Sequence, residues 1–162
     1  MKKTKTKAKV NKTISENISF KEAIFSETAK RLKIKNEPTE NHVKNMKLIA
    51  EKVFQPLREW AGHPIRINSM YRNAELCEAI GSSASSQHTK GQAIDLSSLG
   101  EKTNGELFEW IRENVSFDQL IWEFGNDTNP RWIHVSYVSP QKNRNRALRA
   151  KKKGSQTTYF VI

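Results

Sequence analysis

The feature that most constrains the fold is a long amphipathic stripe in the first half of the chain. Between Pro38 and Gly62, apolar residues recur every three or four positions, which predicts one helix with a single buried face. The stripe consists of Val43, Met46, Ile49, Val53, Phe54, Leu57 and Trp60. A stripe of this kind is typical of a helix that packs on a hydrophobic core, and it contains no cofactor-binding pattern.

Shorter segments complete the predicted architecture. Ser19 and Glu22 form a capping-box pattern, which predicts an earlier helix that ends near Leu32. Alternating polarity predicts strands at 64–69, 92–96, 119–124 and 132–138, and other spacing predicts helices at 73–80 and 104–114. Turn formers at 125–131 make the last two strands a hairpin, and we expect 159–162 to add an edge strand. Helices come first and strands mostly later, so we expect an α+β fold with N-terminal helices packed on a small, mostly antiparallel sheet.

The net charge of +11 is concentrated at the two ends of the chain. Residues 1–12 hold six lysines and residues 141–153 hold seven basic residues, with no acid in either segment. The 15 basic and 17 acidic residues between them leave a formal charge of −2. We expect a basic disordered tail at 1–13 and a single monomeric domain at 14–162. The basic ends favour weak contact with any polyanion, whether nucleic acid, anionic lipid or acidic wall polymer.

The single cysteine limits the ligands that a metal site could use, and the apolar content bears on where in the cell the protein acts. Cys77 is the only cysteine, which excludes an intramolecular disulfide and a multi-cysteine zinc site. A bound metal would therefore need histidine and carboxylate ligands. No segment approaches the ~20 apolar residues of a membrane helix, and no signal-peptide stretch follows the N-terminal lysines. We expect a protein that is cytoplasmic as made and acts elsewhere only after release.

The stretch from Ser86 to Asp95 carries the clearest chemical signal. It reads Ser-Gln-His-Thr-Lys-Gly-Gln-Ala-Ile-Asp and leaves a polar loop to enter a strand. His88 and Asp95 can both bind a metal, and catalytic zinc sites usually combine three such ligands with one open position. His134, in the alternating segment 132–137, is the best third candidate. Each histidine alone is more often structural, so the prediction depends on their combination.

The chain resembles the zinc D-Ala-D-Ala carboxypeptidases and their relatives, which include phage wall endopeptidases and the hedgehog signalling domain. The pattern is Ser-x-His-x-x-Gly-x-Ala-x-Asp followed later by Trp-x-His, and its fixed positions are Ser86, His88, Gly91, Ala93, Asp95, Trp132 and His134. The likeness runs from about Phe20 to the C-terminus and includes the segment 69–72, Ser-Met-Tyr-Arg. It is greatest for the short phage-type branch.

The resemblance implies one zinc ion bound by His88, Asp95 and His134. It also implies that Arg72 binds the substrate carbonyl or carboxylate, a role that suits a planar guanidinium facing developing negative charge. Ser86 is expected either to orient a ligand or to cap the loop. By the same resemblance the chain is a zinc metallopeptidase with an α+β fold.

The general base cannot be copied from the relatives. Several wall endopeptidases have an acid three residues before the last histidine, where this chain has Arg131. We predict Glu123 instead, because a turn centred between 128 and 129 would pair it directly with His134 across the hairpin. Asp127 is the reserve candidate.

The other histidines and most tryptophans lie outside the pattern. His42 follows the start of a predicted helix and His63 precedes a proline, so we expect both to be ordinary solvated residues. Trp60, Trp110 and Trp122 are expected to be core residues and not sugar-stacking platforms.

The resemblance implies zinc-dependent hydrolysis of peptide bonds in the peptidoglycan stem, of carboxypeptidase or endopeptidase type. The enzyme would be a phage endolysin or a virion-associated hydrolase. Two alternatives stay open: a zinc-binding module that does not cleave, and a basic virion assembly or nucleic-acid protein that uses its ends. The spacing of the motif does not specify which stem bond is cut.

Overall fold

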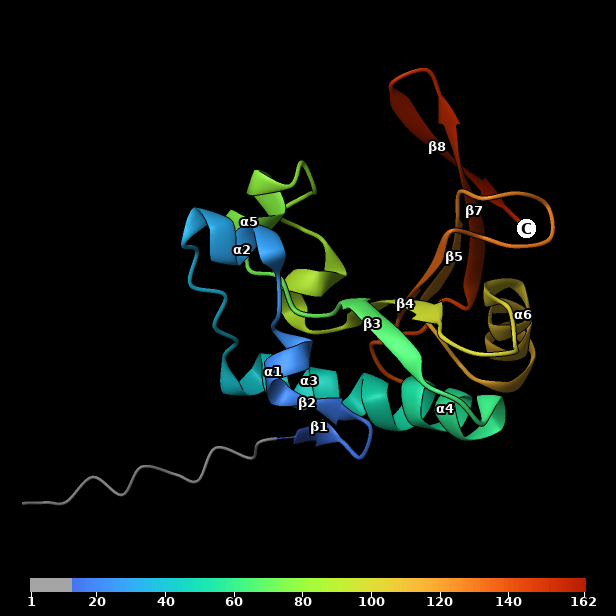
Figure 1. Cartoon of the computed structure of the whole chain (residues 1–162), viewed down its shortest axis with the longest axis horizontal. Helices are drawn as coiled ribbons and strands as arrows, with labels where there is room; N and C mark the ends of the chain where they lie inside the picture. The colour runs from blue at the N-terminus through green and yellow to red at the C-terminus, as the bar shows by residue number, and fades with distance from the viewer. Residues whose placement is uncertain (1–12) are drawn as a thin grey trace, which may run out of the picture.

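A six-stranded mixed sheet forms the centre of the protein, whose computed structural model describes residues 13–162 (Figure 1). In sheet order the strands are β3 (Ile65–Ser69), β4 (Ala93–Ser98), β6 (Trp132–Ser136), β5 (Gln119–Glu123), β7 (Arg146–Lys153) and β8 (Gln156–Val161). All neighbours are antiparallel except β5 and β7, which run parallel. The predicted α+β fold with a mostly antiparallel sheet is confirmed, as is an edge strand near the C-terminus.

The N-terminal elements differ in one respect from the prediction. A short ladder of β1 (Thr13–Ser15) and β2 (Ile18–Ser19) precedes α1 (Phe20–Ala23) and α2 (Glu27–Leu32). The single helix predicted up to Leu32 is therefore wrong. The side chain of Ser26 accepts a hydrogen bond from the backbone N–H of Ala29 and starts a second helix, and its extended backbone interrupts the first. Of the predicted basic tail, residues 1–12 lie outside the described residues.

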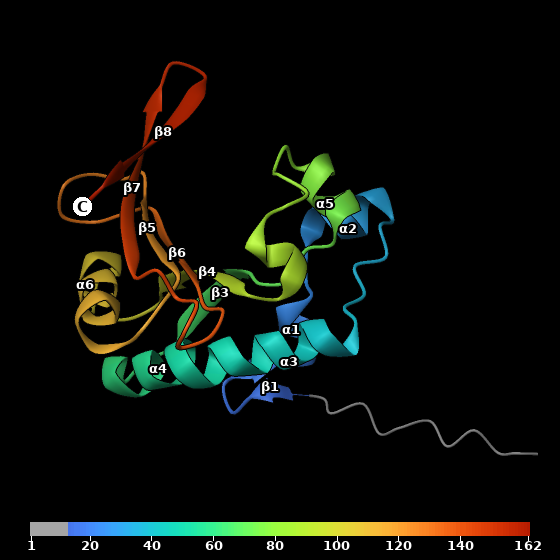
Figure 2. The same cartoon turned by 180° about the vertical axis from the view of Figure 1, so that it is seen from behind.

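The amphipathic stripe forms one continuous helical rod beside the sheet, as Figure 2 shows. The rod consists of α3 (Glu40–Ile49), the π-helical turn η1 (Ala50–Phe54) and α4 (Gln55–Ala61). Thr39 caps its start and Gly62, with a φ of 71°, ends it as predicted. The wider π turn lies next to Pro56, which has no N–H to donate and whose ring would crowd the carbonyl four residues earlier.

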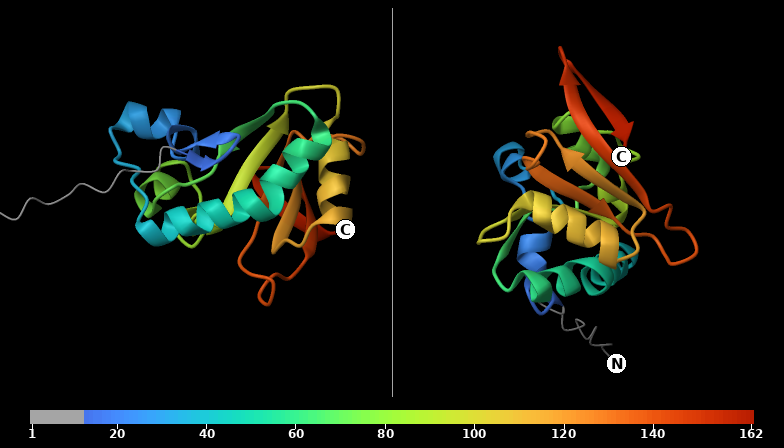
Figure 3. Two further views of the ribbon diagram at one scale, coloured as in Figure 1. Left: turned by 90° about the horizontal axis from the view of Figure 1, so that it is seen from below. Right: turned by 90° about the vertical axis from the view of Figure 1, so that its right-hand side faces the viewer.

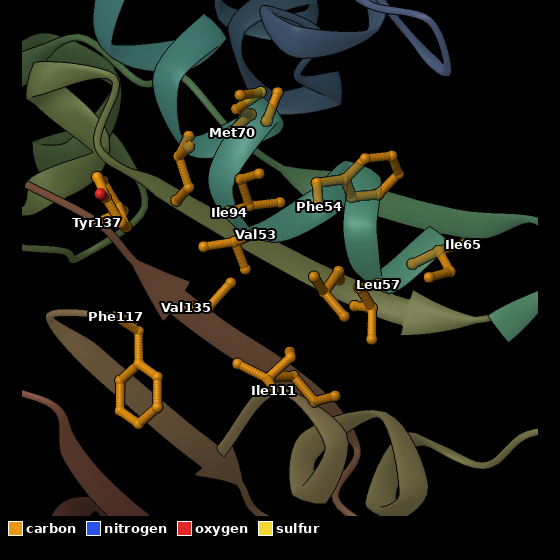
Figure 4. Packing of buried hydrophobic residues seen from close by; sticks show 14 of the residues in the cluster. Val53, Phe54, Leu57, Ile65, Met70, Ile94, Ile111, Phe117, Val135 and Tyr137 are labelled. Atoms are coloured by element: carbon orange, nitrogen blue, oxygen red, sulfur yellow. The ribbon is translucent and has the colours of Figure 1, made fainter. Parts of the chain in front are cut away.

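The core lies between one face of the sheet and the helices. The rod and α6 (Asn104–Asn114), whose bounds match the prediction, cover this face (Figure 3). Figure 4 shows part of the cluster, in which Val53 of the rod, Ile94 of β4 and Val135 of β6 gather between the elements. This packing leaves the opposite face of β4, β6 and β5 available for polar side chains.

Burial tests the prediction for the tryptophans and places the one cysteine. Cys77 is buried in α5 (Ala74–Ala79). Trp122 is buried, but Trp60 is 38% exposed and stacks on Trp110 at the surface, so the core assignment of Trp60 is wrong. Trp60 lies in the last turn of the rod, where its ring packs on Trp110 of α6 outside the core cluster. Within residues 13–162, no helix has the length and apolar character needed to cross a bilayer.

Candidate metal centre

The three predicted ligands come together on the polar face of the sheet. Asp95 of β4 lies directly opposite His134 of β6. His88 comes from the short 3-10 helix η2 (Gln87–Lys90), which leads into β4. One donor atom from each residue lies within 4.8 Å of the others. The sheet register and one tight loop therefore bring together the ligand atoms that a metal ion needs.

The ring of His88 is oriented for ligation. Its Nδ1 donates a hydrogen bond to the carbonyl of Met70, at 2.6 Å, so in the neutral ring Nε2 carries the lone pair. That Nε2 is fully buried and has no hydrogen-bond partner. It lies 3.3 Å from Oδ1 of Asp95, which itself is 2.9 Å from Nδ1 of His134. A buried acceptor without a donor, aimed at a carboxylate, is the arrangement that a cation between them would satisfy.

The protonation states also suit metal binding. Burial lowers the pKa of His88 and outweighs the pull of Asp95, which favours the neutral imidazole. Burial alone would raise the pKa of Asp95, but the adjacent rings of His88 and His134 hold it below its ordinary value. Neutral imidazole and ionised carboxylate are the ligand forms of these side chains.

Arg72 and Ser86 both contact the loop that carries His88. The guanidinium of Arg72 is largely buried, and its Nη1 lies 3.8 Å from Oδ2 of Asp95. The hydroxyl of Ser86 accepts from the backbone N–H of His88, at 3.4 Å, and so caps η2 without touching the ring. Of the two predicted roles for Ser86, the geometry therefore fits the loop cap.

Glu123 does not pair with His134 as the sequence suggested. It lies opposite Trp132, and the partner of His134 is Ile121, so the predicted register is wrong by two residues. The turn is centred one position earlier than predicted because the side chain of Asn126 accepts hydrogen bonds from the backbone N–H groups of Thr128 and Asn129. A shift of two residues keeps the side chain on the same face, so Glu123 remains diagonal to His134.

The environment of Glu123 changes its acidity. The residue is 9% exposed and lines the same cleft as Asp95 and His134. Burial raises its pKa to about 7, against the lowering effect of His134. A carboxyl group with this pKa can accept and return a proton near neutral pH. The reserve candidate Asp127 is exposed, pairs with Arg149 at 2.7 Å and does not line the cleft.

The cleft around these residues has a volume of about 1060 Å³. One wall is the loop 80–86, and the floor continues from β5 onto β7 and β8. Gln119, Arg144, Arg146 and Tyr159 line it although the sequence analysis did not single them out. The alternation of Arg146, Leu148 and Ala150 was the available signal, but it was hidden in a segment that we interpreted as a basic end.

The two remaining histidines lie away from the cleft and serve the local backbone. The ring of His42 accepts a hydrogen bond from the N–H of Thr39 and completes the cap of α3. The ring of His63 accepts one from the N–H of Lys102. Neither lines the cleft, in agreement with the expectation that both are separate from the metal pattern, but both are half-buried and not the solvated side chains that we expected.

Comparison with known families gives one match. A family model described as Peptidase M15 matches residues 16–136, which are 121 of the 162 residues. The matched range contains the three candidate ligands, Arg72 and Glu123, and it ends before β7 and β8. A comparison with curated proteins finds no match.

Proposed function

Because this chain belongs to the peptidase M15 family, we propose that it is a zinc peptidase that hydrolyses peptide bonds in the stem of peptidoglycan. Family membership supports a metallopeptidase. The observation that carries the proposal for this chain is the cluster of His88, Asp95 and His134, whose donor atoms lie within 4.8 Å of one another.

The donor set fits a single zinc ion. Two imidazoles and one carboxylate are a common protein contribution to catalytic zinc, which keeps a fourth position open. The buried Nε2 of His88, without a hydrogen-bond partner, supports the fit. Zinc held there would act as a Lewis acid and lower the pKa of a water molecule to about 7.

We assign proton transfer to Glu123. It lies on the cleft face of β5, diagonally across from His134. Its raised pKa, about 7, lets the carboxyl group exchange a proton near neutral pH. A metal ion held by His88, Asp95 and His134 would add positive charge nearby and favour the ionised form of Glu123. Glu123 would therefore take the proton of the attacking water and return it to the leaving amine.

We assign charge stabilisation to Arg72. Its guanidinium lies beside Asp95, and its Nε is buried without a hydrogen-bond partner. A fixed cation next to the scissile carbonyl would stabilise the negative charge that develops on its oxygen. The carboxylate of Asp95, 3.8 Å away, attracts the guanidinium toward the metal ligands.

We further propose a phage lysis enzyme or a virion-carried peptidase that acts on the wall after release. The likeness of the metal motif to the short phage-type branch supports this setting. Lys151, Lys152 and Lys153 at the end of β7 are exposed, and such charges favour retention on an anionic wall.

Digestion of purified peptidoglycan tests the proposal. The zinc-loaded wild type should release stem fragments, and the chelated protein and His134→Ala should not. His63→Gln, a change outside the cleft, serves as the matched control. Mass spectrometry of the fragments identifies the bond cut. Absence of cleavage by a wild-type chain with one zinc bound would reject the peptidase and favour a non-catalytic zinc module.

A further inference from the structure

The cleft continues along β5 on both sides of the metal ligands. The register places Asp95, His134, Ile121 and Leu148 in one row across four strands. Rows two residues away along the strands are displaced by about 7 Å. The row on one side contains Gln119 and Arg146, and the row on the other contains Trp132, Glu123 and Tyr159.

The two ends of the cleft differ in chemistry. The end beyond Glu123 is aromatic, with Phe124, Trp132 and Tyr159 among its lining residues. The opposite end is basic, because Arg144 joins Arg146 there. Both arginines lie outside the segment that the family model matches.

Arg144 is held in place by a buried carboxylate. Its Nε and Nη2 donate to the two oxygens of Asp118, at 2.8 and 2.6 Å. Asp118 is 3% exposed, whereas the side chain of Arg144 is 52% exposed. The pair leaves further N–H donors of the guanidinium unused, and Arg144 is among the residues that line the cleft. Because the side chain is already ordered, binding an anion there costs little additional conformational entropy.

The backbone of Arg146 is held in place, and its guanidinium is free to bind a ligand. Its N–H donates to the carbonyl of Asp118, at 3.0 Å, and it pairs with Gln119 in the parallel ladder. Within residues 13–162, no carboxylate lies at ion-pair distance from its guanidinium. Two arginines two residues apart, one ordered by Asp118 and one without an acidic partner, form a site suited to a carboxylate.

We propose that Arg144 and Arg146 bind a carboxylate of the substrate at the end of the cleft opposite Glu123. This inference rests on the proposed function and narrows it to stem peptides with a free carboxylate close to the cleaved bond. Arg146 lies one row along the strands and two strands across from His134, a Cα separation of about 12 Å that a long arginine side chain can partly span, so the carboxylate would lie within about four residues of that bond. The aromatic end accepts the less polar part of the same peptide.

Binding of two synthetic stem pentapeptides to the zinc-loaded full chain tests the inference. One peptide has free carboxylates, and in the other every carboxylate is a primary amide. Calorimetry measures affinity, and mass spectrometry of the recovered peptide reports cleavage separately. We expect the free peptide to bind about tenfold more tightly than the amide. Arg146→Gln should remove most of this difference, and Arg66→Gln, an exposed position on β3, should keep it.

The substitution of Arg144 needs a conservative form, because its loss leaves Asp118 buried without a cation. Arg144→Lys keeps the charge and should weaken carboxylate binding by losing the planar fork. Equal affinities for the two peptides, or no binding of either, would overturn the inference even if the wall is cleaved. Carboxylate-dependent binding without cleavage would support it and reject the peptidase.

Discussion

The ring of His88 and the backbone carbonyl of Met70 are joined by a hydrogen bond of 2.6 Å. Met70 follows directly after β3, whose last residue pairs with Asp95. The end of β3 thus orients His88 through a backbone carbonyl and supports Asp95 through strand pairing. This contact lies outside the metal motif, and it assigns the lone pair of the neutral ring to Nε2.

His88→Ala should reduce zinc affinity by more than about 100-fold, because loss of a ligand should exceed the roughly 10- to 100-fold loss typical of residues that only support a ligand. The reason is the loss of a donor that is already oriented by Met70. Competition with a chromophoric chelator measures the affinity, and the zinc-induced rise in Tm provides a second readout. His42→Ala, which removes a helix cap and a ring contact with Tyr71 but none of the candidate ligand atoms, should retain zinc binding. Unchanged affinity in His88→Ala would locate the metal elsewhere.

Glu123→Gln should lower kcat by about 10²- to 10⁴-fold while zinc binding persists. The amide keeps the size of the side chain but cannot accept the proton. Stem-fragment release at several pH values measures the effect, and the wild type should lose kcat/KM as acidification protonates Glu123. Glu113→Gln on the exposed side of α6 provides the matched control. Full activity in Glu123→Gln would remove this residue from proton transfer.

The stability of the metal-free protein should depend on pH through Glu123. Its folded pKa is raised from 4.5 to about 7, so the favourable contribution present at low pH is lost as pH rises through that window. Relative to wild type, Glu123→Gln should therefore gain roughly 2–3 kcal/mol in free energy of unfolding between pH 4 and pH 8. His88 has a lowered pKa and contributes the opposite slope, but it does so in both proteins. Urea unfolding at each pH measures the difference, and a pH-independent difference would contradict the assignment.

Asp118→Asn should destabilise the protein at pH 7 by about 1–3 kcal/mol. Asp118 joins Arg144 to Gln87, the residue before His88, and the bond with Arg144 lowers its pKa. The ionised form of Asp118 stabilises the folded protein above pH 3.8, and this stability is lost as pH falls through the lower pKa of the folded state. Asp127→Asn, which breaks an exposed pair, should cause no measurable change. Urea unfolding of both variants tests whether the two aspartates differ in this way.

Gly91→Ala should lower the free energy of unfolding by more than the cost of a positive φ at an alanine. Gly91 has a φ of 70°, and an added Cβ would clash with the carbonyl of His42. Gly154 has a similar φ of 63° but no atom within 4 Å of such a Cβ, so Gly154→Ala isolates the backbone cost of about 1 kcal/mol. We expect Gly91→Ala to cost roughly 3 kcal/mol or more. Equal losses in thermal unfolding would show that the clash is relieved.

Local patterns in the sequence were sufficient for the helices and for the identity of the candidate ligands. The rod from Glu40 to Ala61 follows from apolar spacing, because a helix repeats every 3.6 residues whatever it packs against. Asn104–Asn114 follows from its cap and spacing for the same reason. Where two caps competed, at Ser19 and Ser26, the sequence analysis used only the first and merged two helices.

Long-range pairing was decided only by the tertiary structure. The partner of Glu123 depends on how many residues the turn uses, and hydrogen bonds of the Asn126 side chain set that number. The position of Arg146 in the cleft depends on the parallel pairing of β7 with β5, a contact between segments with another strand between them in the chain. Alternation along a strand shows which residues share a face, but it does not identify the neighbouring strand. The sequence by itself thus determined most of the helices and the candidate metal ligands, and tertiary pairing decided which other side chains surround those candidates.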